Sequence, residues 1–474
     1  MIKNSFAAVD LGATSGRVVL GTFGQYGFAL DEIHRFANAP TTIDGVLCWN
    51  VDYLFKETLI GLTMAQSHVR ESGSTLEGVA VDSWGVDYGL VDVSTTLIAP
   101  VRHYRAAENS IVALANELVP ASEVYARMGI TQLAINTCFQ LIRDARQGLL
   151  QPGVTALLVP DLWTAWLTGV RGAERTIAST TGLLDWESHD WAKDFMERWG
   201  IPDKVLASIV ETGSLAGGTL PAITKRIGAL NPVPVYRAPA HDTASAFAAV
   251  TSVNSDAAVI SCGTWALVGC LNATAVLTEF AEQTGFTNEV AADGSALLVR
   301  NLSGTWLLEE CFRVWADEHS LDALTLRTHL LRAAQSESVQ VKGTIDCGAP
   351  ELIGTRDMPH QICEIYSREH GDTELNQPQI VRLILESLAE SFARTIVQTS
   401  EITGRALVEI IMIGGGSRIE QLVSLTKRAT GLPVRISHQE ATSVGNICMQ
   451  AVSAGVFTTM DQAKDAAHAN EKGN

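Results

Sequence analysis

Short apolar runs alternate along the chain with longer stretches in which apolar residues recur every three or four positions. The runs at 6–10, 17–23 and 78–83 have the length and composition of buried strands, and 52–73 has the spacing of an amphipathic helix. The last third continues in this way, with a helix expected over 378–404, a strand over 408–413, a helix over 419–431, a strand over 433–436 and a helix over 440–454. This alternation predicts an α/β protein.

One pattern of strand and turn occurs twice. Residues 7–14 read AAVDLGAT and residues 257–264 read AAVISCGT, and a second apolar run follows each of them. Because the two copies stand at the start of each half of the 474-residue chain, they predict two domains of similar topology. We expect these domains over residues 1–246 and 247–474.

Composition narrows the class of protein. The 52 acidic residues outnumber the 34 basic ones, and no dense run of Lys and Arg occurs, so a nucleic-acid partner is not expected. The eight cysteines are scattered without a C-x-x-C pair, which indicates neither a zinc site nor a disulfide framework. The N-terminus lacks the apolar stretch of a signal peptide, and no later run approaches membrane-spanning length. We expect a soluble, cytoplasmic monomer or homodimer with no membrane partner.

The turn between the first two expected strands carries candidate phosphate-binding chemistry. Residues 10–17 read DLGATSGR, in which glycines let several backbone N–H groups converge on one anion. Thr14 and Ser15 add hydroxyl donors, and Arg17 can bind a phosphate with two parallel hydrogen bonds. Asp10, at the strand end, is placed to hold a hydrated Mg²⁺ ion. The spacing fits neither a P-loop nor a Rossmann motif, and a plain polar hairpin tip is the alternative.

Two glycine turns in the second half suit a nucleotide. The Gly263-Thr264 turn could form a matching cradle of N–H groups, although most such turns have no ligand. Residues 414–416 are three consecutive glycines after an apolar strand, where a simple turn would need only one. They indicate a backbone that lies against a flat ligand such as adenine or its ribose.

Two further segments suit a sugar hydroxyl and its activation. Asp242, between His241 and Thr243, could be a helix cap. Transferring a phosphoryl group to a hydroxyl, however, requires a carboxylate that orients the hydroxyl and accepts its proton, and Asp242 lies near the expected domain junction. Trp84, in the segment DSWGVD, could be an apolar plate for the C–H face of a sugar or a core residue.

With these segments in place, the chain resembles the carbohydrate kinases of the FGGY family, in the fold group of actin, hexokinase and Hsp70. The resemblance keeps its order along nearly the whole chain, through AVDLGATSGRVVL (8–20), EIHRF (32–36), VDSWGVDYGLVD (81–92), VPDLWTAWLTG (159–169), HDTASA (241–246), SCGTWALVG (261–269), NLSGTWLLE (301–309), IGGGS (413–417) and EATSVGNI (440–447). The HDTASA and DSWGVD segments together are typical of rhamnulokinase-like members. The resemblance implies an α/β fold of two actin-like (ribonuclease H-like) ATPase domains with a cleft between them.

The resemblance also implies residue roles. It places the β/γ-phosphate loop at Ala13, Thr14, Ser15, Gly16 and Arg17, the Mg²⁺ partner at Asp10, and further nucleotide contacts at Thr264, Glu309 and Gly415. It places sugar contacts at Gly85, His241, Asp242, Thr243 and Asn301, with Asp242 as the general base. The implied reaction uses ATP and Mg²⁺ to phosphorylate the 1-hydroxyl of a ketose, L-rhamnulose.

Two positions depart from the rhamnulokinase-like pattern. Ala106 follows Tyr104-Arg105 where an aspartate is expected, and Glu309 stands where a glutamine is expected. These departures leave L-fuculose, L-ribulose and xylulose open as substrates. A non-catalytic nucleotide switch of the actin or Hsp70 kind is the alternative from another class.

Overall fold

The chain folds into two compact units. The computed structural model describes residues 3–25, 27–250, 256–319, 322–336, 338–352, 355–371, 374–437 and 440–469. The first unit consists of residues 1–252, 272–297 and 440–474, and the second of residues 253–271 and 298–439. A single boundary near residue 246 therefore does not separate the two units, because residues 272–297 and 440–474 cluster with the first unit.

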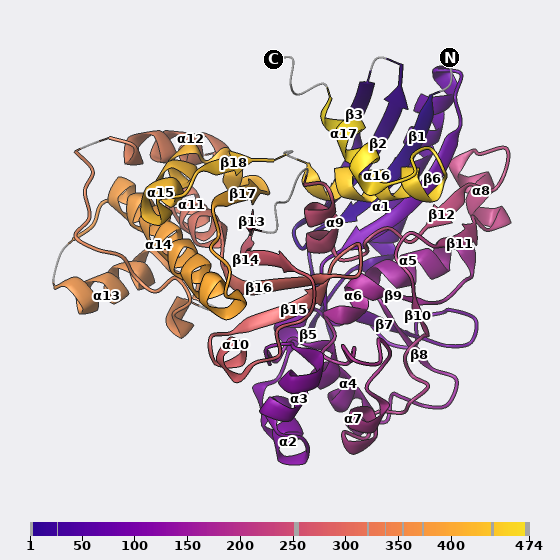
Figure 1. Ribbon diagram of the computed structural model, residues 1–474, viewed down its shortest axis with the longest axis horizontal. Helices are drawn as coiled ribbons and strands as arrows, with labels where there is room; N and C mark the ends of the chain where they lie inside the picture. The colour runs from indigo at the N-terminus through magenta and orange to yellow at the C-terminus, as the bar shows by residue number, and fades with distance from the viewer. Residues whose placement is uncertain are drawn as a thin grey trace. The chain divides into compact units, whose positions relative to one another are not determined.

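A mixed six-stranded sheet forms the centre of the first unit (Figure 1). Its order is β11 (Leu215–Gly218), β12 (Pro234–Tyr236), β6 (Leu76–Ser83), β1 (Asn4–Leu11), β2 (Ser15–Gly24) and β3 (Gly27–Ala37). Strands β1, β2 and β3 are an antiparallel meander, whereas β6 runs parallel to β1 and to β12. The strands expected at 6–10, 17–23 and 78–83 are thus confirmed, each slightly longer than the apolar run.

Helices cover both faces of this sheet. On one face, α1 (Val51–Glu71) packs its apolar side on Val9, Leu11 and Val18. On the other face lies α16 (Ala441–Ser453), whose Met449 packs against Ala80. Alternate residues of a strand point to opposite faces, and β1 is apolar on both faces because helices cover both. Further helices of this unit are α5 (Val159–Thr168), α8 (Pro221–Ile227), α9 (Asp242–Ala248) and α17 (Met460–His468).

A second layer of the first unit has its own apolar core. It contains α2 (Asn109–Leu118), α3 (Ala121–Met128), α4 (Thr137–Arg146), α6 (Arg175–Ser179), α7 (Lys193–Arg198) and the strand pairs β7 (Tyr88–Val91) with β8 (Thr155–Leu158), and β9 (Ala173–Glu174) with β10 (Ile209–Val210). A separate short hairpin of β4 (Thr41–Ile43) and β5 (Val46–Cys48) precedes α1. The returning segment, with α10 (Glu279–Gln283) and β15 (Phe286–Val290), is fixed in this second layer. Tyr125 donates its hydroxyl to the Phe286 carbonyl at 2.8 Å, and the Asn288 N–H donates to the Gly129 carbonyl at 2.7 Å.

The second unit repeats the arrangement of the first. Its strands run in the order β16 (Ala296–Ser303), β14 (Trp265–Asn272), β13 (Ala257–Cys262), β17 (Glu409–Ile413) and β18 (Val434–Ile436). An antiparallel hairpin, β13–β14, is flanked by β17 parallel to β13, just as β6 is parallel to β1 beside the β1–β2 hairpin. The expected similarity of topology between the two halves is therefore present in the sheets.

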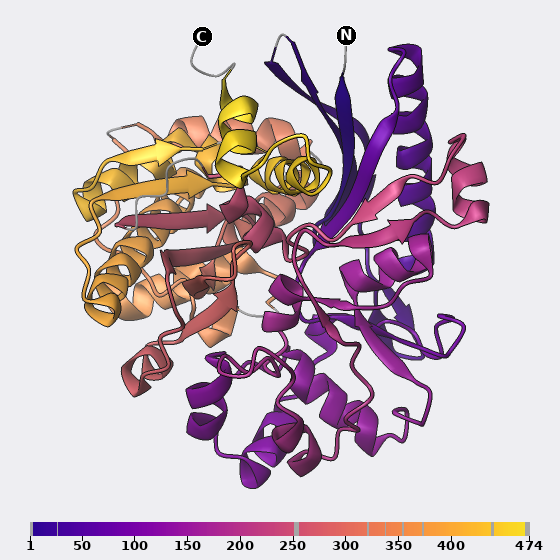
Figure 2. The ribbon, with the colours of Figure 1, turned by 45° about the vertical axis from the view of Figure 1, so that its right-hand side comes forward.

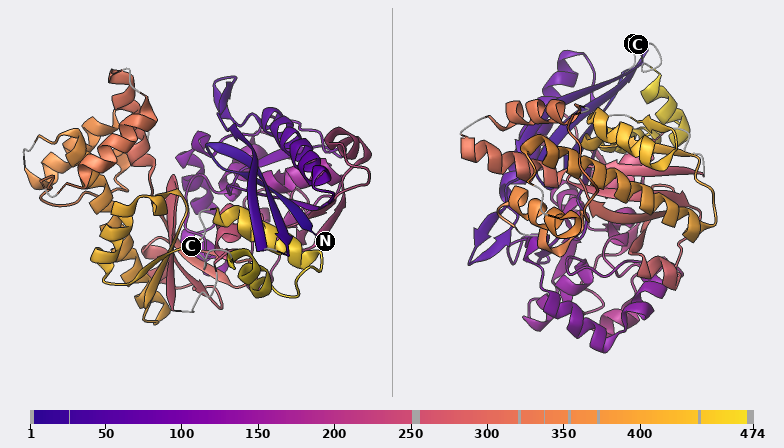
Figure 3. Two further views of the ribbon diagram at one scale, coloured as in Figure 1. Left: turned by 90° about the horizontal axis from the view of Figure 1, so that it is seen from above. Right: turned by 90° about the vertical axis from the view of Figure 1, so that its left-hand side faces the viewer.

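One long helix organises the core of the second unit. It is α14 (Gln377–Thr403), beside α15 (Glu420–Thr430), as Figure 2 shows. Figure 3 shows α11 (Trp306–His319), α12 (Ala323–Ala334) and α13 (Met358–His370) grouped around α14. All five elements expected between residues 378 and 454 are confirmed to within two residues at each end. Within the described ranges, no helix is both long and apolar enough to cross a membrane.

Candidate active site

The first unit holds Asp10 and Arg17 face to face across the β1–β2 turn. They are register partners in the hairpin, and Arg17 Nε and Nη2 donate to Asp10 Oδ2 at 2.9 and 2.6 Å. Arg17 Nη1 donates to Glu440, the residue just before α16, and the Ser443 hydroxyl lies 3.4 Å from Asp10 Oδ2. Burial alone would lower the pKa of Arg17, but the two carboxylates raise it above its ordinary value. The guanidinium therefore stays charged.

The backbone of the turn is fixed by hydrogen bonds from Asn38. Asn38 donates its side-chain N–H to the Gly12 carbonyl at 2.8 Å and its backbone N–H to the Thr14 carbonyl at 3.0 Å. Neither Gly12 nor Gly16 has a positive φ, so the backbone conformation itself does not require glycine at these positions. Gly16 instead lies against the ring of Phe36, where a Cβ atom would overlap it. Thr14 is exposed, and Ala13 and Ser15 are half-buried.

A second carboxylate, Asp82, lies beside Asp10. The two are register partners on the parallel strands β1 and β6. Asp82 is fully buried, and its Oδ2 accepts a hydrogen bond of 2.5 Å from Asn446 of α16. Burial and the nearby Asp10 charge raise the pKa of Asp82 well above its ordinary value. The sequence interpretation missed this role of α16, although Ser443, Asn446 and Gln450 form a polar stripe at helical spacing on a buried helix.

Asp242 is the first residue of α9 and its side chain is partly open to solvent. The N-cap of α9 is His241, which makes no capping hydrogen bond through its side chain, so the capping interpretation of Asp242 is wrong. The side chain of Asp242 is 33% exposed, and the Thr243 hydroxyl lies 3.2 Å from its Oδ1. Burial raises the pKa of Asp242, His241 opposes this shift, and Asp10 adds to it.

A buried glutamate fixes the backbone that carries Asp242. Glu174 Oε2 accepts hydrogen bonds from the backbone N–H of Thr176 at 2.9 Å and of Ala240 at 3.1 Å. The Thr176 hydroxyl accepts from the His241 N–H at 3.1 Å, and the Ser83 N–H donates to the Ala240 carbonyl at 2.9 Å. Residues 240 and 241 are therefore tied to β6 and to the start of α6. Sequence reasoning did not single out Glu174.

Trp84 lies in a buried aromatic group beside this backbone. It is 6% exposed, its ring centroid lies 4.2 Å from that of Trp49, and His103 stacks on Trp49 at 4.0 Å. Asp87 Oδ2 accepts from both indole N–H groups, at 2.6 and 3.1 Å. Burial raises the pKa of Asp87 to about 6, although these hydrogen bonds oppose the shift. Trp84 is thus part of the core.

Ala106, one of the two positions that depart from the family pattern, and Gly85, the expected sugar contact, lie close in the chain to members of this aromatic group. Ala106 ends the short 3₁₀ turn Tyr104–Ala106 that follows His103 and is half-buried. Gly85 lies against Thr180, where an added Cβ atom would come within 3.1 Å of the side chain. Burial lowers the pKa of His103 to about 4, and Arg105 contributes to the shift. The imidazole ring of His103 is therefore neutral near pH 7.

The second unit holds the other expected nucleotide contacts. Thr264 lies in the β13–β14 turn, which is tied to residue 304 by a 3.2 Å hydrogen bond from the Gly304 N–H to the Thr264 carbonyl. Asn301, which was expected to contact the sugar, also belongs to this unit and is exposed on β16. Glu309 is exposed on α11, and Arg327 Nε lies 3.3 Å from its Oε1, so part of the extra negative charge is neutralised inside the unit.

The three glycines at 414–416 differ in backbone conformation and in the space around each Cα atom. Gly414 has φ of 83°, and a Cβ atom on it would lie 2.7 Å from the Cys262 carbonyl. A Cβ atom on Gly416 would overlap the Cys262 sulfur. Gly415 is exposed, has no positive φ and has open space around its Cα. Internal packing therefore explains two of the three glycines, and Gly415 is free to lie against a ligand.

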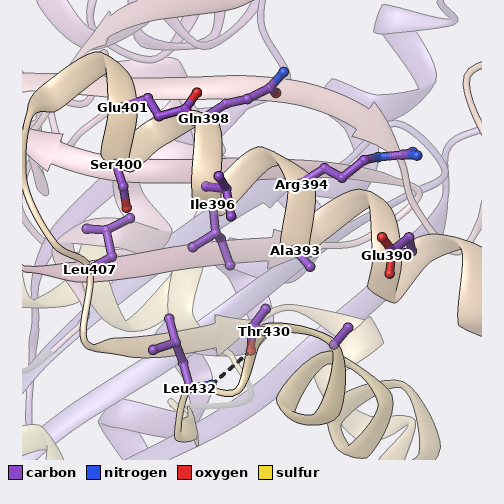
Figure 4. A pocket seen from close by; sticks show the side chains of 12 residues that line it. Glu390, Ala393, Arg394, Ile396, Gln398, Ser400, Glu401, Leu407, Thr430 and Leu432 are labelled. Carbon is purple, nitrogen blue, oxygen red and sulfur yellow. Dashed lines mark hydrogen bonds between the residues drawn. The ribbon is translucent and has the colours of Figure 1, made fainter.

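A shallow cavity of about 590 Å³ lies elsewhere in the second unit (Figure 4). Side chains of α14, including Arg394 and Gln398, form one wall, and Leu407 and Leu432 lie opposite. Leu407 precedes β17, whereas Gly415 follows it, so the cavity lies at the other end of this strand from the glycine turn. It does not contain any of the residues expected from the sequence to bind a ligand.

No ready-made metal cluster accompanies Asp10. Among the residues that the structure describes, no group of three or more His, Cys, Asp or Glu side chains is arranged to hold a metal ion. Mg²⁺ bound to a nucleotide usually needs only one or two carboxylates, because phosphates and water supply its other ligands. Asp10, at the strand end beside the turn, fits this requirement.

Family models match both parts of the chain. The N-terminal domain of the FGGY family of carbohydrate kinases matches residues 6–249, and the C-terminal domain of the same family matches residues 258–454. Among curated relatives, a rhamnulokinase of Bacteroides thetaiotaomicron is 33% identical over 463 residues, which are 96% of this chain and 92% of the relative. A rhamnulokinase of Klebsiella pneumoniae is 31% identical over 471 residues, which are 98% of this chain and 92% of the relative.

Solved structures agree in fold. A ligand-bound xylulose kinase from Lactobacillus acidophilus matches with a TM-score of 0.79 at 14% identity, over 98% of this chain and 92% of its own. A xylulose kinase from Rhodospirillum rubrum matches with a TM-score of 0.77 at 16% identity, over 97% of this chain and 92% of its own. The expected α/β fold of two actin-like ATPase domains is confirmed. The chain belongs to the FGGY family of carbohydrate kinases and is an ATP-dependent sugar kinase.

Proposed function

We propose that this kinase transfers the γ-phosphoryl group of ATP to the 1-hydroxyl of L-rhamnulose, giving L-rhamnulose 1-phosphate, with Asp242 as the general base. The observation that carries the proposal is the position of Asp242. It is a partly exposed carboxylate at the end of a rigid, buried polar network that contains His241, Glu174 and Thr176. The relatives that are 31–33% identical are rhamnulokinases, which supports the choice of sugar.

Asp242 orients the sugar hydroxyl and accepts its proton as the oxygen bonds to phosphorus. Such assistance is typically worth about 10²–10⁴-fold in rate. The Asp10 charge and burial raise the pKa of Asp242, which makes it a stronger base, while His241 favours its ionised form. Sugar contacts are assigned to Gly85, Thr243 and Asn301, with Trp84 and Trp49 as the apolar backing behind Gly85.

The phosphate subsite is assigned to the β1–β2 turn. Backbone N–H groups of residues 13–16 and the guanidinium of Arg17 bind the β- and γ-phosphates, and Asp10 binds the hydrated Mg²⁺ ion. This ion would neutralise negative charge on the phosphates as the γ-phosphoryl group leaves. In the second unit, Thr264, Glu309 and Gly415 are assigned to the nucleotide.

The sugar is the open part of the proposal. Ala106 removes a carboxylate that rhamnulokinase-like members have, at a position two residues from Tyr104 and the aromatic group. L-Fuculose, L-ribulose and xylulose are therefore the alternative substrates. We place the reaction in the cytoplasm, where ATP is available and where the free cysteines of the described residues would remain reduced. The active form is a monomer or homodimer that needs no membrane or nucleic acid.

The test is the release of ADP from ATP and Mg²⁺ with L-rhamnulose, L-fuculose, L-ribulose, D-xylulose and L-xylulose in parallel. The proposal expects a kcat/KM for L-rhamnulose that is about tenfold or more above the other ketoses. Asp242→Asn should lose turnover by about 10²–10⁴-fold while its affinity for ATP stays within about twofold of the wild type. Faster turnover of another ketose would replace L-rhamnulose, and normal turnover by Asp242→Asn would remove Asp242 as the base.

A further inference from the structure

We infer that Glu289 is a positioning residue for the catalytic carboxylate: it holds His241 as an imidazolium between two carboxylates, and His241 in turn keeps Asp242 in place. The inference rests on the proposed role of Asp242 as the base. It assigns a chemical task to the segment 272–297, which belongs to the second half of the sequence but clusters with the first unit.

The three side chains form a line that leads from the interior to the solvent. His241 Nδ1 lies 3.1 Å from Glu289 Oε2, and His241 Nε2 lies 3.4 Å from Asp242 Oδ1. The side chains of Glu289 and His241 are 10% and 8% exposed, against 33% for Asp242. Glu289 Oε2 and His241 Nδ1 have no hydrogen bond of good alignment, so charge is the main attraction between them. A neutral ring has only one N–H, so it could present a donor to Glu289 or to Asp242 but not to both.

The backbone on both sides of His241 is fixed. Residues next to Glu289 are held by the Asn288 N–H, which donates to the Gly129 carbonyl at 2.7 Å, and by the Val290 N–H, which donates to the Ser179 hydroxyl at 2.9 Å. The His241 N–H donates to Thr176 at 3.1 Å. The backbone that carries Glu289 and the backbone that carries His241 are therefore both tied to α6, which fixes the starting points of the two side chains.

The charges around His241 favour its protonated form. Glu289 on β15, Asp242 on α9 and Glu174 on β9 are the charged groups that face it. Burial lowers the pKa of His241, but these carboxylates, Glu289 first among them, raise it to about 9. Asp242 itself faces the negative charge of Asp10, and His241 is the cation that offsets this repulsion. Loss of the imidazolium charge would remove the attraction that holds the Asp242 carboxylate in place.

The first test follows the protonation of His241 directly. Histidine labelled with ¹³C at Cε1 is titrated by NMR, and the His241 signal is assigned by its absence from His241→Asn. The wild-type signal should titrate near pH 9, and in Glu289→Gln it should titrate at least about one pH unit lower, a tenfold change in the equilibrium. Glu289→Asp retains the charge and should restore most of the difference. Glu279→Gln makes the same chemical change at an exposed position of the same segment and should leave the titration unchanged.

The second test is the pH profile of kcat. In the wild type kcat should fall as pH rises through about 9, because the charge that holds Asp242 in place is lost. In Glu289→Gln the fall should begin at lower pH, with kcat at pH 8 reduced by about twofold or more and KM for ATP little changed. Wild-type His241 that titrates at or below pH 6.5, or a Glu289→Gln titration equal to that of the wild type, would overturn the inference. The NMR titration of His241 does not depend on Asp242 as the base, and an inactive Asp242→Asn enzyme would support that role whatever the titration of His241.

Discussion

Arg17 donates two hydrogen bonds to a single carboxylate oxygen of Asp10, its partner across the β1–β2 hairpin. A third donor of the same guanidinium reaches Glu440 at the start of α16. One cation is thus shared by two carboxylates at the turn proposed to bind phosphate. Negative charge close to a phosphate site would oppose binding, so the position of Arg17 decides whether an anion can enter.

Arg17→Lys should weaken the binding of ATP and Mg²⁺. Lysine retains the charge but lacks the planar fork, so it cannot bind Asp10 and a phosphate group at the same time. We expect the Kd for ATP to rise by about tenfold, since hydrogen bonds to charged groups are worth about 1.5–3 kcal/mol each. Isothermal titration calorimetry measures the change.

The matched control for Arg17→Lys is Arg198→Lys. Arg198 pairs with Glu123 on the surface of the helical layer, and loss of an exposed pair has little effect. Its Kd for ATP should equal that of the wild type. Equal affinity in Arg17→Lys as well would show that the fork of Arg17 does not contact the nucleotide.

The sequence predicted the elements well because their signals are local. The helix over 377–403 has apolar residues at helical spacing and a glycine at its end, and the structure closes it at Gly404 in the left-handed conformation. The following strand is a continuous apolar run, as expected for a strand buried on both faces. The paired openings at residues 7 and 257 likewise predicted the two sheets, because each is a strand and turn that can be recognised alone.

The sequence did not predict which distant segments complete the site. Glu289 lies beside His241, which is 48 positions earlier in the chain. The composition of the strand that contains Glu289 does not indicate this contact. Asn446 was part of a recognised segment, but its contact with Asp82 depends on which face of α16 meets β6. Such contacts follow from packing of whole elements, and a local pattern carries no information about them. The pattern of Ser443, Asn446 and Gln450 was the one available signal.

Gly415 and Gly416 should respond differently to alanine. Gly415→Ala meets no neighbouring atom and requires no unusual backbone, so the free energy of unfolding should stay within about 0.5 kcal/mol of the wild type. An added methyl group would nevertheless stand where the nucleotide is proposed to lie, and the Kd for ATP should rise. Urea unfolding and calorimetry together measure the two effects.

Gly416→Ala is the matched control for packing. Its methyl group would overlap the Cys262 sulfur, and overpacking of this kind typically costs about 1–3 kcal/mol. We expect an unfolding midpoint at lower urea concentration than that of Gly415→Ala. Unchanged ATP affinity in a folded Gly415→Ala protein would exclude a contact between Gly415 and the nucleotide.

His103 should make the first unit less stable in weak acid. Burial lowers the pKa of His103 to about 4 in the folded protein, against an ordinary value of 6.5. Between these two pH values the unfolded chain binds a proton that the folded chain does not, so the free energy of unfolding falls as pH decreases from about 6.5 to about 4. His103→Asn supplies an oxygen in place of Nδ1, which accepts the Arg105 N–H at 3.0 Å, but it cannot take up a proton. The variant loses the stacking on Trp49 at every pH, yet the midpoint of its urea transition, followed by tryptophan fluorescence, should depend less on pH across this window.

The matched control is His360→Asn, the same change on the exposed surface of α13, which should retain the wild-type dependence. A His103→Asn protein whose midpoint falls as steeply as that of the wild type would show that His103 is not the group whose protonation opposes folding.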